Sequence, residues 1–267
     1  MITDCTKLIE YICAELKKFT DVAVLGVSGG ADSTLVAILC KDALGPNNVY
    51  AVSMPYDNKD VNIYNRRAEL IARKLGINHL LRPITQIADA ITAQIYIENN
   101  KQISAVNAGN ARSRARMAVL YGIAYSLNEQ FAPARVRVIG TGNLSEGFIG
   151  YCTKGGDAVA DIFPIGNLYK SEVYQLLDYY RNKGVINESD IDRIPTAGLW
   201  QGQTDEGELG WSYDQIEQGI RYCMEHYEEM DKSDANDGVI GFVWKRHKAN
   251  LHKLSRANII ALRHLCR

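Results

Sequence analysis

The sequence lacks any long apolar run. Its longest purely apolar stretches cover only a handful of residues, as at 22–25, whereas a membrane-spanning helix needs about 20 residues. The first residues carry Glu10, Glu15, Lys17 and Lys18 in a helical pattern, so the uninterrupted apolar segment of a signal peptide is also missing. We therefore expect no membrane association and no export signal.

Excess charge and paired cysteines are missing as well. The 267 residues include 30 Lys and Arg against 31 Asp and Glu, a net charge of −1, and this balance argues against a basic surface for DNA or RNA. The 6 cysteines are scattered and form no C-x-x-C pair. Without an export signal, free thiols in a reducing compartment are the better interpretation, so we expect a cytoplasmic protein that binds no nucleic acid.

Strand-like and helix-like segments alternate over the first half of the chain. Short apolar runs bounded by glycine or polar residues predict strands at 22–27, 49–54, 77–81 and 136–140. Amphipathic spacing predicts helices at 4–19, 32–44, 60–75, 84–98 and 110–127. This alternation indicates an α/β fold with a mainly parallel, doubly wound, Rossmann-like sheet, followed by a helical C-terminal part. Because no linker or internal repeat is visible, we expect a single domain over residues 1–267.

The strongest local signal lies between the first predicted strand and its helix. It is the motif S-G-G-x-D-S with the residues before it: Gly26, Val27, Ser28, Gly29, Gly30, Ala31, Asp32 and Ser33. Glycines let the backbone approach an anion closely, and amides at a helix start donate to phosphate oxygens. An aspartate beside phosphate needs a divalent cation between them, so Asp32 is a candidate magnesium ligand. The alternative is a plain glycine turn in which Asp32 and Ser33 only cap the helix.

This loop resembles that of the ATP pyrophosphatase superfamily, in which S-G-G-x-D-S binds the pyrophosphate of ATP while an acyl or carbonyl oxygen attacks the α-phosphorus. The resemblance implies that the residues of the loop bind ATP as co-substrate and that AMP and pyrophosphate are products. It does not select the second substrate, because GMP synthetases, argininosuccinate synthetases, tRNA thiolases and NAD synthetases all carry such a loop. It is not a Walker A motif, since the G-K-[ST] ending is absent.

A second segment narrows the choice. Residues 110–117, with Tyr121, resemble the N-x-x-x-R-x-R-M-x-x-x-Y segment of NAD synthetases, and the resemblance implies that Arg114 and Tyr121 bind deamido-NAD. The two residues are about two helical turns apart and so share a helix face. A guanidinium and an aromatic ring on one face suit a carboxylated pyridine ring. Read alone, the three arginines of this segment would form a solvated basic face.

A Gly-rich stretch after the fourth predicted strand also matches NAD synthetases. Thr141 and Glu146 have the spacing of the family, and K-G-G-D-x-x-x-D follows at 154–161. The resemblance implies that Thr141 binds ATP, and Glu146 is our second magnesium ligand beside Asp32. Several carboxylates in one loop should repel one another and raise some of their pKa values unless cations compensate.

The K-G-G-D-x-x-x-D stretch supplies three further candidates. By resemblance Lys154 and Asp161 contact the dinucleotide, and Asp157 lies beside the reacting end as a catalytic residue. Taken by itself, K-G-G-D would be a surface turn. The matched spacing of the whole stretch favours the functional interpretation.

Two phosphate-binding candidates follow. The resemblance implies that Lys170, at the start of a helix, and Thr196, after a proline, bind ATP phosphates. A lysine there would neutralise charge that grows as pyrophosphate departs. Taken alone, Lys170 is a first-turn lysine and Thr196 a loop residue. The stretch 201–213 resembles G-Q-T-D-E-x-E-L-G-x-x-Y and predicts a mobile cover over the site.

The C-terminal segment contributes His247 and Lys248. They resemble the H-K of a C-terminal H-K-R that reaches the deamido-NAD substrate, although Ala249 replaces the arginine. A metal pair of His247 with His252 is the alternative, but no cysteine or acidic partner converges on them.

Together the motifs imply an ammonia-dependent NAD synthetase. The nicotinate carboxylate of deamido-NAD would attack the α-phosphate of ATP, and ammonia would then displace AMP, with Asp32, Asp157 and Lys170 catalytic and Mg²⁺ as cofactor. The family forms homodimers, so we expect a dimer, and because the motifs fill the chain we expect no glutaminase domain. No residue is assigned to adenine, since the glutamine that several family members use is absent from 54–58.

Two alternatives stay open. One is another ATP pyrophosphatase, such as a GMP synthetase-like amidating enzyme or an RNA thiolase, although a thiolase would want catalytic cysteines and a basic RNA surface. The other is a nucleotide sensor that kept the loop but lost the chemistry.

Overall fold

A parallel sheet lies at the centre of the molecule. The computed structural model describes residues 1–56, 64–95, 103–190, 204–230 and 238–254. Within them the strands form one sheet in the order β3-β2-β1-β4, with every neighbouring pair parallel. The strands are β1 (Val22–Gly26), β2 (Val49–Ser53), β3 (Asn78–Leu81) and β4 (Val136–Ile139). The predicted parallel α/β fold is confirmed, and each predicted strand lies within one residue of the observed ends.

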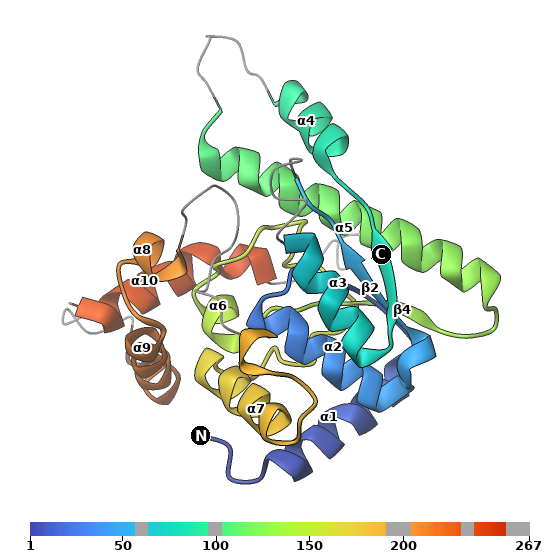
Figure 1. Cartoon of the computed structure of the whole chain (residues 1–267). Helices are drawn as coiled ribbons and strands as arrows, with labels where there is room; N and C mark the ends of the chain where they lie inside the picture. Colours follow the sequence, from blue (N-terminus) through green and yellow to red (C-terminus); the bar gives the residue numbers. More distant parts are fainter. Residues whose placement is uncertain (57–63, 96–102, 191–203, 231–237, 255–267) are drawn as a thin grey trace, which may run out of the picture.

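Helices cover both faces of this sheet (Figure 1). One face packs against α1 (Cys5–Phe19), α2 (Ala31–Leu44), α3 (Tyr64–Leu75) and α7 (Lys170–Asn182). The other face packs against α4 (Thr85–Gln94) and α5 (Ala105–Gln130). Alternating β1 residues explain the two cores, because Ala23 and Leu25 belong to the first core and Val22 and Val24 to the second.

The helix boundaries differ most from the predicted ones in α4 and α5. Helix α5 begins at Ala105 instead of 110, because Ser104 caps it by accepting a hydrogen bond from Asn107 N at 3.2 Å. Helix α4 ends at Gln94, before the predicted 98. The predicted start of α3, at residue 60, lies outside the described residues. Short 3₁₀ turns occur at η1 (Pro46–Asn48) and η2 (Glu188–Asp190).

The C-terminal helices form a third core beside the sheet. It joins α6 (Leu144–Phe148), α9 (Tyr213–Glu225) and α10 (Gly238–Leu254), with the short α8 (Asp205–Leu209) next to them at the left of Figure 1. Helices α9 and α10 approach closely at Gly219, where a Cβ would lie 2.9 Å from Val243 Cγ2. This packing confirms the predicted helical C-terminal part and brings α10 beside the loop that follows β4.

The strand order creates a crevice between β1 and β4. From β1 the chain crosses through α2 to β2 on one side, whereas from β3 it returns to β4 on the other side of β1. The loops that leave β1 and β4 therefore diverge, and ligands of such sheets bind at this switch point beyond the carboxyl ends of the strands. Across the described residues, none of the helices has the length and apolar character needed to cross a membrane.

Candidate functional site

The loop 26–33 connects β1 to α2 at the crevice. Its turn is held internally: Gly30 N donates to Ser28 Oγ at 3.2 Å, and Ser33 Oγ donates to Gly30 O at 3.2 Å. Gly29 has a φ of +76°, and a Cβ there would lie 2.9 Å from the Cβ of Arg67 on α3. Glycine is therefore required at this position both by backbone conformation and by the close approach of α3.

The capping alternative for this loop is wrong. The N-cap of α2 is Gly30, so no N-cap side chain accepts a hydrogen bond from the first turn of the helix. The side chain of Asp32 instead points to the loop after β4, where Asn143 Nδ2 donates to its Oδ1 at 2.9 Å. The backbone N–H groups at the start of α2 therefore lie in a glycine-rich loop, an arrangement that suits an anion.

Lys170 joins the two predicted magnesium ligands. It is the first residue of α7 and only 4% exposed, and its Nζ lies 2.5 Å from Asp32 Oδ2 and 3.2 Å from Glu146 Oε1. Asn143 supports the same arrangement, because its Oδ1 accepts from Glu146 N at 3.0 Å. The predicted residues Asp32, Glu146 and Lys170, far apart in the sequence, thus form one charged cluster.

Burial and charge compete in this cluster. Burial lowers the pKa of the Lys170 ammonium, but the facing Glu146 and Asp32 carboxylates outweigh it, so its pKa lies above the usual value and the lysine is protonated. Burial raises the pKa of Glu146 to about 7; Lys170 opposes the shift, and Asp32 and Asp205 add to it. The predicted rise in a carboxyl pKa is confirmed for Glu146, but its causes are burial and carboxylates from other elements, not the neighbouring loop aspartates.

The donor chemistry of Asp32 and Glu146 fits magnesium. Both offer carboxylate oxygens, the ligands that Mg²⁺ prefers. In the part of the chain that the structure describes, no three His, Cys, Asp or Glu side chains are placed to hold a metal ion. Two protein carboxylates suit an ion that completes its octahedral shell with substrate phosphate oxygens and water.

Asp205 and Tyr213 are site residues that the sequence assigned only to a cover. Asp205 is 3% exposed, and Tyr213 Oη lies 3.0 Å from Asp205 Oδ2 and 3.3 Å from Glu146 Oε1. The Tyr213 ring lies 5.2 Å from Lys170 Nζ. Tyr213, the last residue of the matched motif, was the available signal for this contact, because a buried hydroxyl needs polar partners. Thr196 lies outside the described residues.

Glu217 of α9 supports the start of α7. This buried carboxylate accepts hydrogen bonds from Ser145 Oγ at 3.1 Å, Ser171 N at 3.0 Å and Ser171 Oγ at 2.6 Å. Ser145 Oγ in turn accepts from Lys170 N at 3.0 Å. The first two residues of α7 are therefore fixed through their backbones, Lys170 to α6 and Ser171 to α9.

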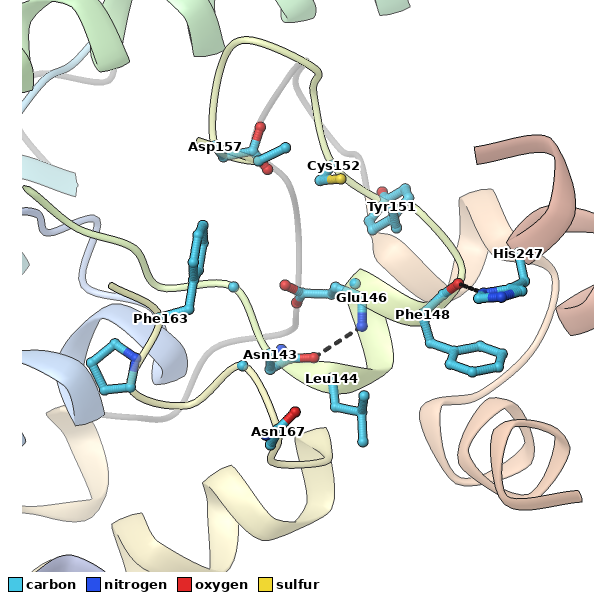
Figure 2. A pocket seen from close by; sticks show the side chains of 15 residues that line it. Asn143, Leu144, Glu146, Phe148, Tyr151, Cys152, Asp157, Phe163, Asn167 and His247 are labelled. Atoms are coloured by element: carbon cyan, nitrogen blue, oxygen red, sulfur yellow. Dashed lines mark hydrogen bonds between the residues drawn. The ribbon is translucent and has the colours of Figure 1, made fainter. Parts of the chain in front are cut away.

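A cavity of about 550 Å³ opens beside Glu146 (Figure 2). Besides Glu146 it is lined by the predicted residues Asp157 and His247, with Phe148 and Phe163 providing apolar surface. Figure 2 shows Glu146, on α6, and Asp157, on the loop that follows, facing the same space. Apolar walls with a few carboxylates suit a flat ring that carries a polar group.

Asp157 is held by helix α5. Its Oδ1 accepts from Ser113 Oγ at 2.6 Å and from Thr153 N at 2.9 Å, and its own N donates to Ser113 Oγ at 3.0 Å. Gly156 permits this contact, because a Cβ there would lie 2.3 Å from Ser113 Oγ. The stretch K-G-G-D is thus an exposed turn, as the alternative expected, and it is tied to α5 through Ser113.

The predicted deamido-NAD residues on α5 contact the same loop. Arg114 Nε donates to Lys154 O at 3.1 Å, and Tyr121 Oη donates to Asp161 Oδ1 at 3.4 Å. Tyr121 and Asp161 line a second cavity of about 200 Å³, apart from the one at Glu146. The structure thus pairs Arg114 with Lys154 and, about two turns later on α5, Tyr121 with Asp161. Thr141, half-buried, follows β4 at the sheet's carboxyl edge.

The basic face of α5 is engaged rather than solvated. Arg112 stacks over the Tyr56 ring with its Cζ 3.6 Å from the ring centroid, and Arg116 Nε donates to Met54 O at 3.1 Å. With Arg114 on Lys154, each arginine of the segment has a specific contact, so the solvated-face alternative is wrong.

His247 and Lys248 both lie on α10, and of the two His247 lines the cavity. The His247 ring stacks on Phe148 at 4.2 Å, and its Nδ1 lies 2.9 Å from Phe148 O. Lys248 is exposed, with its Nζ 5.5 Å from the Trp244 ring. The alternative metal pair gains no support among the described residues, because His252 Nδ1 lies 3.1 Å from Ala249 O.

Comparison with known proteins gives consistent matches. A family model described as NAD synthase matches residues 3–257. The NH(3)-dependent NAD(+) synthetase of Fusobacterium nucleatum is 37% identical over 227 residues, which cover 85% of this chain and 81% of the relative. That of Methanococcus aeolicus is 41% identical over 210 residues, covering 79% and 78%.

Solved structures agree over nearly the full length. The NMN synthetase from Francisella tularensis superposes with a TM-score of 0.74 at 29% identity, covering 96% of this chain and 97% of that one. The NH3-dependent NAD synthetase from Campylobacter jejuni superposes with a TM-score of 0.70 at 30% identity, covering 97% and 100%.

Proposed function

This chain belongs to the NAD synthase family, and on that basis we propose that it forms NAD from deamido-NAD and ammonia, with ATP as co-substrate and AMP and pyrophosphate as products. The contact of Lys170 with Asp32 and Glu146 carries the proposal, because it puts a protonated lysine between the phosphate loop and the cavity. That arrangement suits a reaction in which pyrophosphate departs next to a bound acid.

The chemistry needs an activated acid. A free carboxylate resists attack by ammonia because oxide is a poor leaving group. Attack of the nicotinate oxygen on the α-phosphorus forms a mixed anhydride and releases pyrophosphate; ammonia then attacks the acyl carbon and AMP leaves. Lys170 stabilises the charge that develops on the pyrophosphate. Asp157, held through Oδ1 by Ser113 and Thr153, orients the incoming ammonia beside the ring.

A covalent thiol intermediate is not needed. Cys152 lines the cavity, but burial, followed by the Asp157 carboxylate, raises the pKa of its thiol to about 11. A thiol with this pKa is a poor nucleophile near neutral pH.

Magnesium would be held by Asp32 and Glu146. When bound, the ion supplies positive charge to the phosphates of ATP. The chain's own contribution is to fix the two carboxylates through Asn143 and to present Lys170 beside them.

Further parts of the proposal follow from the motifs and the family. Thr141, Thr196 and the loop 26–33 bind ATP, and deamido-NAD is bound by Arg114, Tyr121, Lys154, Asp161, His247 and Lys248. Residues 1–267 act as a single synthetase domain that uses ammonia. A homodimer and a cytoplasmic location complete the proposal.

A product assay tests this function. With deamido-NAD, ATP, Mg²⁺ and ammonium we expect AMP, pyrophosphate and NAD in equal amounts, measured by chromatography. Nicotinate mononucleotide is the matched comparison substrate, because the Francisella tularensis structure is called an NMN synthetase; we expect a lower kcat/KM for it. AMP release only with XMP would favour the GMP synthetase-like alternative, and no AMP with any acid would favour the sensor.

A further inference from the structure

Arg116 has been assigned no role by the motifs or the comparisons. It bonds Met54, whose Cε lies 3.2 Å from the position of a Cβ on Gly26, the first residue of the phosphate loop. Arg116 belongs to α5, which leads into β4 and so runs opposite to the parallel strands. Leu120, one turn later on α5, packs against β1, with its Cδ1 3.7 Å from the position of a Cβ on Gly26. Arg116 is therefore one helical turn beyond Gly26 toward the carboxyl edge of the sheet, where the phosphate loop begins.

A single hydrogen bond fixes its guanidinium at this edge. Arg116 Nε donates to Met54 O at 3.1 Å. Met54 directly follows β2. Val27, just after β1, still donates through its N to Val52 O at 3.0 Å, so the segments that leave β1 and β2 run side by side. Among the described residues, the bond to Met54 O is the one hydrogen bond of the Arg116 side chain, and it uses Nε and not the terminal nitrogens. The two terminal nitrogens, Nη1 and Nη2, can therefore donate to two oxygens of a phosphate.

Arg116 would add a positive charge to those that Lys170 and a bound magnesium ion supply. The loop 26–33 contains no lysine or arginine, and the single ammonium of Lys170 faces two carboxylates, those of Asp32 and Glu146. Burial lowers the pKa of Arg116 to about 10, with Arg112 acting in the same direction and Asp157 against it. Arg116 is therefore charged at neutral pH.

Resting on the proposed function, we propose that Arg116 is a catalytic residue that contacts the α-phosphate of ATP. A carboxylate oxygen of deamido-NAD forms a bond to the α-phosphorus while the bond to pyrophosphate breaks, and its electron pair leaves on the pyrophosphate. Negative charge rises on the two non-bridging α-oxygens, which the guanidinium fork binds without transferring a proton.

The test is single-turnover pyrophosphate release with deamido-NAD, ATP and Mg²⁺, without ammonium. We expect Arg116→Met to slow release by about 10²–10³-fold, the usual loss for one removed charge-stabilising donor, and Arg116→Lys to recover part of it. The two diastereomers of ATPαS give a readout that a structural role would not move. The parent should prefer one diastereomer, and this preference should fall toward equality in both variants.

Arg135→Met is the matched control. Arg135 lies at the opposite, amino edge of the sheet and pairs with Asp21 at 2.9 Å, so its loss should leave both the rate and the diastereomer preference unchanged. An Arg116→Met rate within about threefold of the parent, or an unchanged preference in Arg116→Lys, overturns the role of Arg116. No pyrophosphate from the parent protein would instead overturn the proposed function.

Discussion

Replacing Lys170 by methionine will slow pyrophosphate release by about 10²–10³-fold. Its Nζ is 2.5 Å from Asp32 Oδ2, and methionine keeps the apolar stem while removing the charge that faces the phosphate loop. The same change leaves two partly buried carboxylates facing each other, so we expect the free energy of unfolding to fall by about 3 kcal/mol. Stopped-flow detection of pyrophosphate and urea denaturation measure the two effects.

Lys41→Met is the control for this prediction. Lys41 forms an ion pair with Asp42 at 3.3 Å on the exposed side of α2, so its loss should cost less than about 1 kcal/mol and leave turnover unchanged. A Lys170→Met protein that is folded and turns over at the parent rate would show that Lys170 has only a structural role.

Asp32→Asn will raise the Mg²⁺ concentration needed for half-maximal activity by at least about tenfold and lower turnover by about 10²-fold or more. Asparagine can still accept from Asn143, so it removes the carboxylate with less disturbance than alanine, which would leave both Asn143 and Lys170 without this partner. Lys170 keeps Glu146, and we therefore expect the fold to persist. Magnesium titration of AMP formation gives both quantities.

Asp42→Asn is the matched control on the same helix. Asp42 Oδ2 accepts from Tyr180 Oη at 2.8 Å, away from the crevice, so the magnesium requirement should not change. Equal magnesium midpoints for the parent and Asp32→Asn would contradict the assignment of Asp32 as a ligand.

The fold was predictable because its strands are short, buried and bounded by clear stops. Gly45 and Pro46 mark the end of α2, and the apolar runs of β1 and β2 have no helical alternative of sufficient length. The start of α5 was harder: its first turn consists of small and polar residues apart from Val106, which is exposed, so the Ser104 cap is the main signal there. Sequence periodicity reports the buried part of a helix better than its ends.

The charged cluster was predictable only in part. Motif spacing singled out Asp32, Glu146 and Lys170 separately, but nothing in the sequence states that Lys170 Nζ bonds both carboxylates. The approach of Tyr213 to Glu146 depends on how α9 packs against α6, a contact between segments distant in the chain. Such contacts are set by tertiary packing and leave no local pattern.

Isotope transfer tests the central claim, that the acid is activated by adenylation, most directly. Deamido-NAD labelled with ¹⁸O in both oxygens of its nicotinate carboxylate is turned over with ATP, Mg²⁺ and ammonium, and the AMP is analysed by mass spectrometry. Attack of the carboxylate on the α-phosphorus predicts one ¹⁸O in every AMP formed and one retained in the amide of NAD. AMP without label would contradict the account, because its new oxygen would then have come from water.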